Sequence, residues 1–366
     1  MSRLIGIRHR IKQTADQKAH PTQMFTISRE GTQTFNLSNE ASELDWVLGK
    51  LAVKKSKKKH GLQPGDQVAM VLGGSGDNLA YSLSRRAEEI GAEVFRIPPA
   101  VLKQHRNGGD KNDDAALLAD LLKTNPQEFY KIQPRDRDLI WLRVTLQARI
   151  DAMKARIACE QRLRQRVVGQ TFCSPEGKFP EGGIEKAFAD LKANDVILQA
   201  LIKEETARDR ELLKALQILP VYQQILKPIE GCGPAIASRI IAAVQDVRRF
   251  PTAAKLKAFC GVHLLTDGRF PRRRHGELAN WQPEARQALY LLGEQFNKWR
   301  PNSAWGKKFR EYKIHFRTVH PEIETNDNNK KKYTDGHIHK MATWRTLTKF
   351  VEFLYKEWWR LENEAK

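Results

Sequence analysis

The chain has 366 residues, of which 63 are Lys or Arg and 43 are Asp or Glu, so its formal net charge is +20. A hydrophobic fraction of 40% excludes a mostly disordered basic tail, because it supplies enough apolar side chains for packed cores. No apolar run reaches the ~18 residues of a membrane span, and the first residues lack the apolar core of a secretory signal. The four cysteines show no paired spacing. We therefore expect a cytoplasmic protein with reduced thiols, no membrane partner and an affinity for polyanions such as nucleic acid.

The first 125 residues are expected to form an α/β domain. β-rich runs lie at residues 4–11 and 24–38, and short apolar strands are expected within 67–74 and 93–99. Stretches with apolar residues at helical spacing separate the later strands. A hairpin followed by strand–helix–strand–helix order predicts a mixed sheet with helices on its faces, as in ribonuclease-H-like folds.

Residues 135–218 differ in character from the first domain. Residues 135–168 have a helical period without Gly or Pro, residues 169–183 are rich in Gly and Pro, and residues 184–219 resume the helical period. Two long helices around such a break predict an antiparallel helical hairpin of coiled-coil type. Such arms often mediate dimerisation, so we expect a homodimer.

Residues 219–366 are expected to form a helical, strongly basic domain. Its sharpest motif has Gly231, Gly233 and Ala237 at the spacing of a helix-hairpin-helix turn. In such a turn Gly231, Gly233 and Pro234 would allow the backbone to approach a phosphate at the N-terminus of the next helix. A glycine turn between packed helices, with no ligand, is the alternative.

Basic residues follow this turn and continue to the end of the chain. Arginines beside an aromatic residue suit phosphates and unstacked bases, and a solvated charge run is the alternative. No cysteine lies near the His337–His339 pair, so we expect no metal site and no cofactor. The residues expected to bind nucleic acid are Gly231, Gly233, Pro234, Arg239, Arg248, Arg249, Arg269, Arg272, Arg273, Arg274, His275, Lys307, Lys308, Lys331, Lys332, His337, His339, Lys340 and Arg345.

A two-metal nuclease site on a ribonuclease-H-like fold needs carboxylates on the first strand, at the end of a central strand and on a helix. Arg8 and Val71 stand at the first two places, and neither side chain can coordinate Mg²⁺. Asp110, Asp113 and Asp114 remain near the helix, where helix capping is their alternative role. We therefore expect no catalytic residue and no enzymatic activity.

The whole chain resembles the bridge-RNA-guided DEDD insertion-sequence transposases and the Piv-like invertases. The resemblance is carried by residues 5–10, 68–80 and 110–122, and most specifically by residues 229–262. It implies an N-terminal RuvC-like domain, a coiled-coil arm and a C-terminal domain with a catalytic serine. The chain has Thr266 and Asp267 in the loop where that serine is expected, so the transposase serine is not found.

The arm and residues 233–262 also resemble the Nop domain of nuclease-lacking TIGR-associated (Tas) proteins. This resemblance implies a short guide RNA as a partner and DNA complementary to the guide as the target. The expected fold class is α/β plus all-α, with a degenerate RuvC-like domain (1–125), a coiled-coil arm (135–218) and a Nop- or transposase-like domain (219–366).

Three functions remain open at this point. The main prediction is an RNA-guided DNA-binding protein that does not cleave its target. The first alternative is an enzyme with an atypical active site: either an RNA-guided transposase or recombinase that uses Thr266, or a RuvC-type nuclease that uses Asp110, Asp113 and Asp114. The second alternative is a Nop-like structural component of a ribonucleoprotein with no DNA target.

Overall fold

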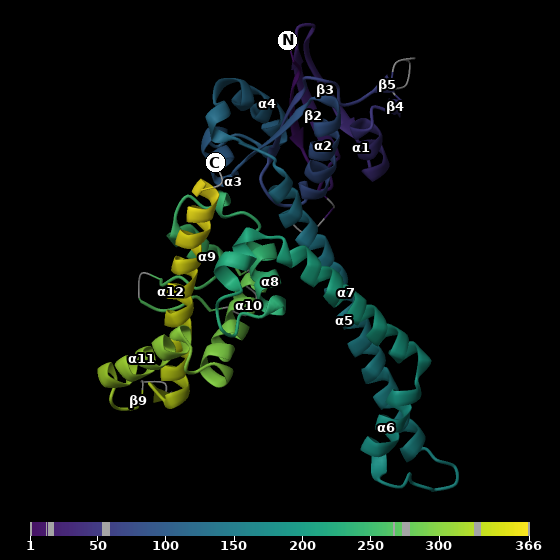
Figure 1. Cartoon of the computed structure of the whole chain (residues 1–366), viewed down its shortest axis with the longest axis vertical. Coiled ribbons are helices and arrows are strands. Elements are labelled where there is room, and N and C mark those ends of the chain that lie inside the picture. Colours follow the sequence, from purple (N-terminus) through teal and green to yellow (C-terminus); the bar gives the residue numbers. More distant parts are fainter. Residues whose placement is uncertain are drawn as a thin grey trace.

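Figure 1 shows the chain as a computed structural model, which describes residues 2–11, 13, 18–52, 59–265, 268–272, 279–325 and 331–364. The N-terminal α/β part lies at the top of the view. A long helical arm descends from it on one side and the helical C-terminal body on the other, so the outline is an inverted V (Figure 1). No helix within the described ranges is long and apolar enough to cross a membrane.

The N-terminal part contains a mixed sheet of six strands in the order β3-β2-β1-β6-β7-β8. The first three strands pair antiparallel, β6 and β7 continue the sheet parallel to β1, and β8 pairs antiparallel with β7. The predicted mixed α/β sheet is therefore present. Its strands are β1 (Leu4–Arg8), β2 (Thr22–Ser28), β3 (Gly31–Leu37), β6 (Gln67–Val71), β7 (Glu93–Ile97) and β8 (Tyr130–Lys131), and a separate hairpin is formed by β4 (Leu51–Ala52) and β5 (Lys59–His60).

Helices cover both faces of this sheet. Ile5, Ile7 and Met70 belong to a core on the face of α1 and α2, whereas Ala69 and Leu118 belong to a core on the face of α4. Alternate residues of a strand point to opposite faces, so positions 5, 7 and 9 of the chain point toward α1 and α2. The helical elements are α1 (Glu40–Val47), α2 (Asp77–Ile90), α3 (Pro99–Arg106), η1 (Lys111–Asp113), α4 (Asp114–Thr124) and η2 (Pro126–Glu128).

The contact between α4 and β1 depends on a glycine. A Cβ at Gly6 would lie 1.9 Å from the carbonyl oxygen of Ala115 and 2.8 Å from the backbone nitrogen of Ala119. Only a residue without a side chain permits this approach of helix to strand. The close packing fixes the start of α4 beside the middle of β1.

The arm consists of α5 (Pro134–Phe172), which runs the length of the arm, and of α6 (Gly183–Asn194) and α7 (Val196–Gln217), which return along it (Figure 1). The prediction of one continuous returning helix is wrong at Asp195. Its side chain accepts a hydrogen bond from the backbone N–H of Leu198 and so caps α7 as a new helix.

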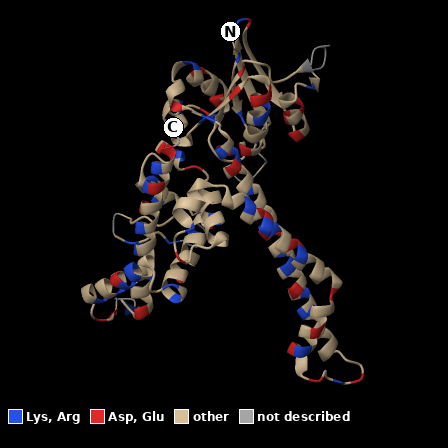
Figure 2. Cartoon of the chain, in the orientation of Figure 1, with Lys and Arg blue, Asp and Glu red and all other residues tan. Residues whose placement is uncertain are grey.

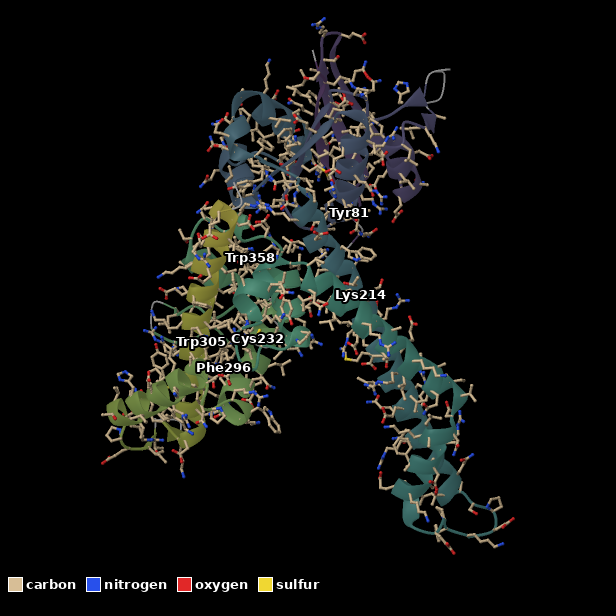
Figure 3. All side chains as sticks on the ribbon, in the orientation of Figure 1. Tyr81, Lys214, Cys232, Phe296, Trp305 and Trp358 are labelled. Carbon is tan, nitrogen blue, oxygen red and sulfur yellow. The ribbon has the colours of Figure 1, made fainter. Side chains whose placement is uncertain are left out.

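The C-terminal body shares one hydrophobic core with the base of the arm. This core includes Leu142 of α5, Leu216 of α7, and Phe296 and Trp358, which are labelled in Figure 3. The elements of the body are η3 (Val221–Leu226), α8 (Pro234–Val244), η4 (Val247–Arg249), α9 (Ala253–Phe259), α10 (Pro283–Glu294), η5 (Gln295–Trp299), α11 (Ala304–Val319), β9 (Glu324–Thr325), β10 (Lys331–Lys332) and α12 (Asp335–Glu364).

A buried ion cluster joins the base of the arm to the C-terminal body, and Arg96 of β7 in the N-terminal sheet lies 3.9 Å from its Asp136. Arg248, only 6% exposed, lies 2.5 Å from Asp136 at the start of α5, 2.6 Å from Asp246, and 3.7 Å from Glu362 near the end of α12. These carboxylates raise the pKa of Arg248 far enough to outweigh the burial that lowers it. The structure therefore corrects the expected phosphate contact of Arg248, because its guanidinium is already fully engaged inside the protein.

Replacement of Arg248 tests this cluster. Arg248→Met leaves the buried carboxylates of Asp136 and Asp246 without their cation, and breaking a buried pair in this way costs about 3–5 kcal/mol. We expect the midpoint of urea unfolding, followed by circular dichroism, to fall accordingly. Arg239→Met, at a half-buried position on α8, is the matched control and should change the midpoint little. Equal effects of the two variants would contradict the role assigned to the cluster.

Candidate nucleic-acid interface

In the glycine turn before α8, Gly231 is packed against the protein, whereas Gly233 and Pro234 are exposed. Gly231 has a φ of +90°, and a Cβ there would lie 2.9 Å from Cβ of Gln295. Its lack of a side chain therefore serves packing against η5, which differs from the expected approach to a phosphate. Gly233 is the N-cap of α8, and a Cβ there would meet nothing within 4 Å. Gly233 and Pro234 are exposed, so this half of the turn remains accessible to an anion.

The loop between α9 and α10 is fixed by Arg286. Its guanidinium lies 4.4 Å from the ring centre of Trp281 and 4.4 Å from that of Trp344. It also donates hydrogen bonds to the carbonyl oxygens of Gly261 and Pro271, at 2.9 and 2.8 Å. Burial lowers the pKa of Arg286. Arg286 therefore holds the loop at Gly261 and Pro271 beside Trp344 of α12.

Two arginines of this loop are at its surface. Arg269 and Arg272 are exposed, and the charge of Arg272 is one of the causes that lower the pKa of His337 on α12. The ring of Phe270, two residues before Arg272, lies 6.5 Å from that of Trp344, so this part of the loop runs beside α12. The expected contacts at Arg273, Arg274 and His275 lie outside the described residues, as does Thr266.

A stack of three rings lies where α11 and α12 meet. The ring of Tyr333 is 3.7 Å from that of His320 and 5.4 Å from that of His337, and the interplanar angles are 5° and 4°. Tyr333 has a φ of 55°, and its carbonyl oxygen accepts a hydrogen bond of 3.0 Å from Arg317. Partial burial is the main cause that lowers the pKa of His337, and Arg272 adds to it. The stack provides flat rings beside cations, a combination suited to bases and phosphates.

Exposed lysines surround this stack. Lys331 and Lys332 lie on β10, and Lys340 lies on α12. Figure 2 marks Lys and Arg positions along the ribbon of α11 and α12, together with Asp and Glu positions on the same helices. We call His320, Tyr333 and His337 with Lys331, Lys332 and Lys340 the basic face.

Other expected contacts lie on the same two helices or elsewhere in the body. Lys307 is exposed on α11, Lys308 lies over the ring of Trp305 at 5.6 Å, and Arg345 lies over the ring of Tyr312 at 6.0 Å. Arg249 is directed away from any such surface. It donates to the carbonyl oxygen of Val244 and to Oε1 of Gln245, and its guanidinium lies 5.4 Å from the ring centres of Phe250 and Phe259.

The two histidines of the His-x-His pair make separate contacts. His339 packs edge-on against Phe309 and lies 3.8 Å from Glu294, whereas His337 accepts a hydrogen bond from the backbone of Tyr333. The residues of the described ranges contain no group of three or more His, Cys, Asp or Glu that could hold a metal ion.

The carboxylates near the start of α4 do not converge. Asp114 is bound by Arg106 through two hydrogen bonds of 2.8 and 2.9 Å, and Asp110 accepts a hydrogen bond from the backbone N–H of Asn112. Asp113 is exposed. Asp110 therefore caps η1, and the charge of Asp114 is neutralised inside the protein.

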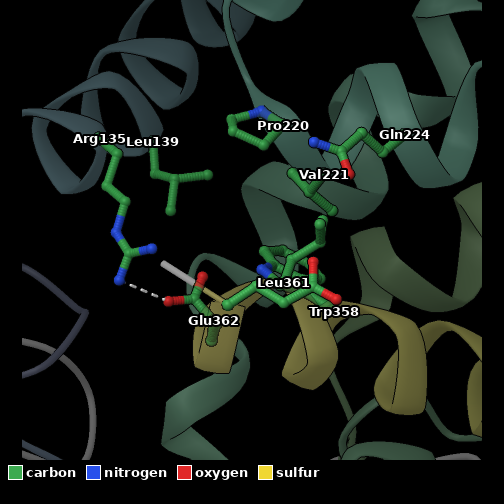
Figure 4. A pocket seen from close by; sticks show the side chains of 9 residues that line it. Arg135, Leu139, Pro220, Val221, Gln224, Trp358, Leu361 and Glu362 are labelled. Atoms are coloured by element: carbon green, nitrogen blue, oxygen red, sulfur yellow. Dashed lines mark ion pairs between the residues drawn. The ribbon is translucent and has the colours of Figure 1, made fainter. Parts of the chain in front are cut away.

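A pocket of about 270 Å³ lies apart from the basic face, between the base of the arm and the end of α12 (Figure 4). Its walls include Leu139, Val221 and Trp358, and an ion pair of 2.9 Å joins Arg135 to Glu362 at its edge. The pocket is mainly apolar and adjoins the buried ion cluster.

Comparison with known proteins relates the chain to mobile-element enzymes. Residues 223–306 match the sequence model of the transposase IS116/IS110/IS902 family, a segment that runs from η3 to the start of α11. The match covers less than a quarter of the chain and supports a relation to insertion-sequence transposases. No curated protein matches the chain.

This match corrects the prediction about catalysis. A transposase segment points to a catalytic recombinase or transposase, so the expectation that the chain is not an enzyme is wrong. The absence of expected carboxylates at Arg8 and Val71 led to that expectation. The match therefore favours the transposase or recombinase alternative over the protein that binds without cleaving.

Neutralising the basic face tests its contact with nucleic acid. The triple variant Lys331→Gln, Lys332→Gln, Lys340→Gln should weaken RNA binding. It should also lower the slope of log affinity against log salt concentration by about 0.7–0.9 for each lysine that contacts a phosphate. The measurement is a salt titration by fluorescence anisotropy.

The matched control neutralises three exposed lysines of the arm, in the triple variant Lys154→Gln, Lys186→Gln, Lys203→Gln. Its net charge equals that of the first variant, so a difference in slope reports position and not total charge. Identical slopes for both variants would show that the basic face does not contact the RNA.

Proposed function

We propose that the protein is a recombinase or transposase that is guided by a short RNA and rearranges DNA. The observation that carries the proposal is the match of residues 223–306 to insertion-sequence transposases. Arg286 lies within this segment and fastens its basic loop to α12, beside the basic face. The transposase-like segment and the positively charged surface therefore form one continuous region of the C-terminal body.

Guide binding is the part of the proposal that rests on charge and on the resemblance to Nop domains. The net charge of +20 requires a polyanionic partner or abundant counterions. The ring stack of His320, Tyr333 and His337 offers stacking surfaces next to exposed lysines. Single-stranded RNA is bound by such combinations of stacking and phosphate contacts. Base pairing by the guide would then select the DNA target.

The N-terminal part is proposed to be a RuvC-like, ribonuclease-H-like domain. An antiparallel meander extended by the parallel strands β6 and β7, with helices on both faces, supports this assignment. The arm is proposed to be a coiled coil that mediates a homodimer. Ion pairs join α5 to the returning helix α7, for example the pair of 2.8 Å between Arg149 and Asp209. Val196 and Ile197, exposed by 81% and 67%, offer apolar surface on α7.

The test is a recombination assay on the full chain with the RNA that purifies with it. The RNA is sequenced first, and two DNA duplexes are built with segments complementary to it. We expect new junctions between the duplexes, detected by amplification and sequencing across the junction. Duplexes with the same composition in shuffled order are the control. Absence of RNA, or RNA-dependent DNA binding without cleavage or junctions, would contradict the proposal.

A further inference from the structure

Three side chains of the N-terminal domain lie in a row at one end of its sheet, the first two joined by a hydrogen bond and the last two by a longer ion-pair contact. Oγ of Ser75 lies 3.0 Å from Nδ1 of His9, and Nε2 of His9 lies 3.6 Å from Oε1 of Glu43. Ser75 is exposed, whereas Glu43 is only 6% exposed. A hydroxyl, an imidazole and a buried carboxylate in this order are the arrangement that activates a serine as a nucleophile.

The alternation of side chains along β1 directs His9 to the face of the sheet that α1 and α2 cover. His9 follows Arg8, the last residue of β1, and is in phase with Ile5 and Ile7, which point toward α1 and α2. Glu43 lies in α1 and faces the same side of the sheet. Its Oε1 accepts a hydrogen bond of 2.5 Å from the hydroxyl of Thr22 on β2 and lies 3.4 Å from Nε of Arg10. These contacts fix the carboxylate beside the imidazole.

Glycines bring Ser75 over the imidazole. The turn between β6 and α2 has positive φ angles of +83° at Gly73 and +99° at Gly74. A Cβ at Gly76 would lie 3.2 Å from Cβ of His9, so a larger residue would press against the histidine. The result is a sharp strand-to-helix turn with an exposed serine directly before the N-terminus of α2.

The rest of the chain holds this turn in place. Arg143 of α5 donates a hydrogen bond of 3.3 Å to the carbonyl oxygen of Gly74. A Cβ at Gly73 would lie 2.4 Å from Oε1 of Gln245, which belongs to the transposase-like segment 223–306. The turn that carries Ser75 therefore touches both the arm and the segment on which the proposed function rests.

The electrostatic surroundings keep His9 able to accept a proton. Burial is the main cause that lowers the pKa of His9 below 6.5, and the charges of Arg10 and His20 add to it, whereas the charge of Glu43 and the backbone of Arg10 oppose it. His9 is therefore mostly neutral at pH 7, the form that a general base requires. Glu43 stabilises the imidazolium that forms when His9 takes a proton.

We propose that Ser75 is the nucleophile of the DNA strand-transfer reaction, that His9 is its general base, and that Glu43 is a positioning residue for His9. This inference rests on the proposed function, since it names the active site of that recombinase. The phosphate would approach Ser75 at the N-terminus of α2, where Gly76 leaves the first backbone N–H groups without a side-chain cap.

The reaction balances without a redox step. Oγ of Ser75 forms a bond to the phosphorus of a DNA phosphodiester while Nδ1 of His9 takes the hydroxyl proton. The bond from phosphorus to one deoxyribose oxygen breaks, and that oxygen receives the proton from His9 and leaves as a hydroxyl. The DNA is then joined to Ser75 as a phosphodiester. Attack by a hydroxyl of a second strand reverses these steps and releases Ser75.

The first experiment needs neither guide nor DNA. The full chain is treated with an alkyl fluorophosphonate, whose phosphorus is attacked by an activated serine with loss of fluoride, and the modified residue is identified by mass spectrometry. We expect modification of Ser75, slowed at least about 100-fold in His9→Gln. Ser82→Ala, on the same helix, should leave the rate unchanged. A wild-type protein whose Ser75 is not modified would overturn the inference.

The pH dependence of this modification distinguishes the role of Glu43. The wild-type rate should rise with pH and reach half of its maximum below pH 6.5, because the reactive form of His9 is the neutral one. Glu43 raises the pKa of His9, so Glu43→Gln should shift the profile to lower pH. An unchanged profile would contradict the positioning role. Circular dichroism of each variant shows whether it is folded.

The second experiment uses the recombination assay and separates failure of this inference from failure of the proposed function. We expect a covalent protein–DNA product on denaturing gels that maps to Ser75, and at least about a 100-fold loss of junctions in Ser75→Ala. Junctions that persist in Ser75→Ala and disappear in Thr266→Ala would overturn the inference and leave the proposed function standing. Modification of Ser75 by the fluorophosphonate without any wild-type junctions would contradict the proposed function instead.

Discussion

The buried contact of Arg248 with Asp136 and Asp246 is the interaction on which the arrangement of the whole chain depends. It joins the first turn of α5 to the segment after α8, and Glu362 of α12 completes it. Charges removed from water must be paired, so the two parts cannot separate without leaving charges unpaired inside the protein. The cluster therefore fixes the arm and the C-terminal body in one relative position, and Arg96 of β7, 3.9 Å from Asp136, links the N-terminal sheet to it.

This fixed position has a consequence for chemistry. The segment after α8 also contains Gln245, which lies against the glycine turn that carries Ser75. The ion cluster thus places the transposase-like segment against the end of the central strands where Ser75, His9 and Glu43 meet. A strand-transfer enzyme must hold its reactive groups and its nucleic acid in register, and a rigid junction between domains supplies that condition.

Much of the fold could be predicted because its signals are local. The short apolar runs at β6 and β7 and the Gly- and Pro-free sequence within residues 135–168 define the sheet and the arm without any long-range information. The roles of single charged residues could not be predicted, because they depend on contacts between distant parts of the chain. Arg248 has the appearance of a phosphate ligand in sequence, but its partner Asp136 lies 112 residues away. His9, Glu43 and Ser75 come from three separate elements, so no local motif marks them.

The proposed rearrangement of DNA by the protein can be measured directly in cells. Two plasmids, each with a segment complementary to the RNA that purifies with the protein, are introduced together with the intact chain, and all junctions are sequenced. We expect junctions at the complementary segments and none when the segments are shuffled. Plasmids that stay unjoined and uncut while the protein is bound to them would contradict it.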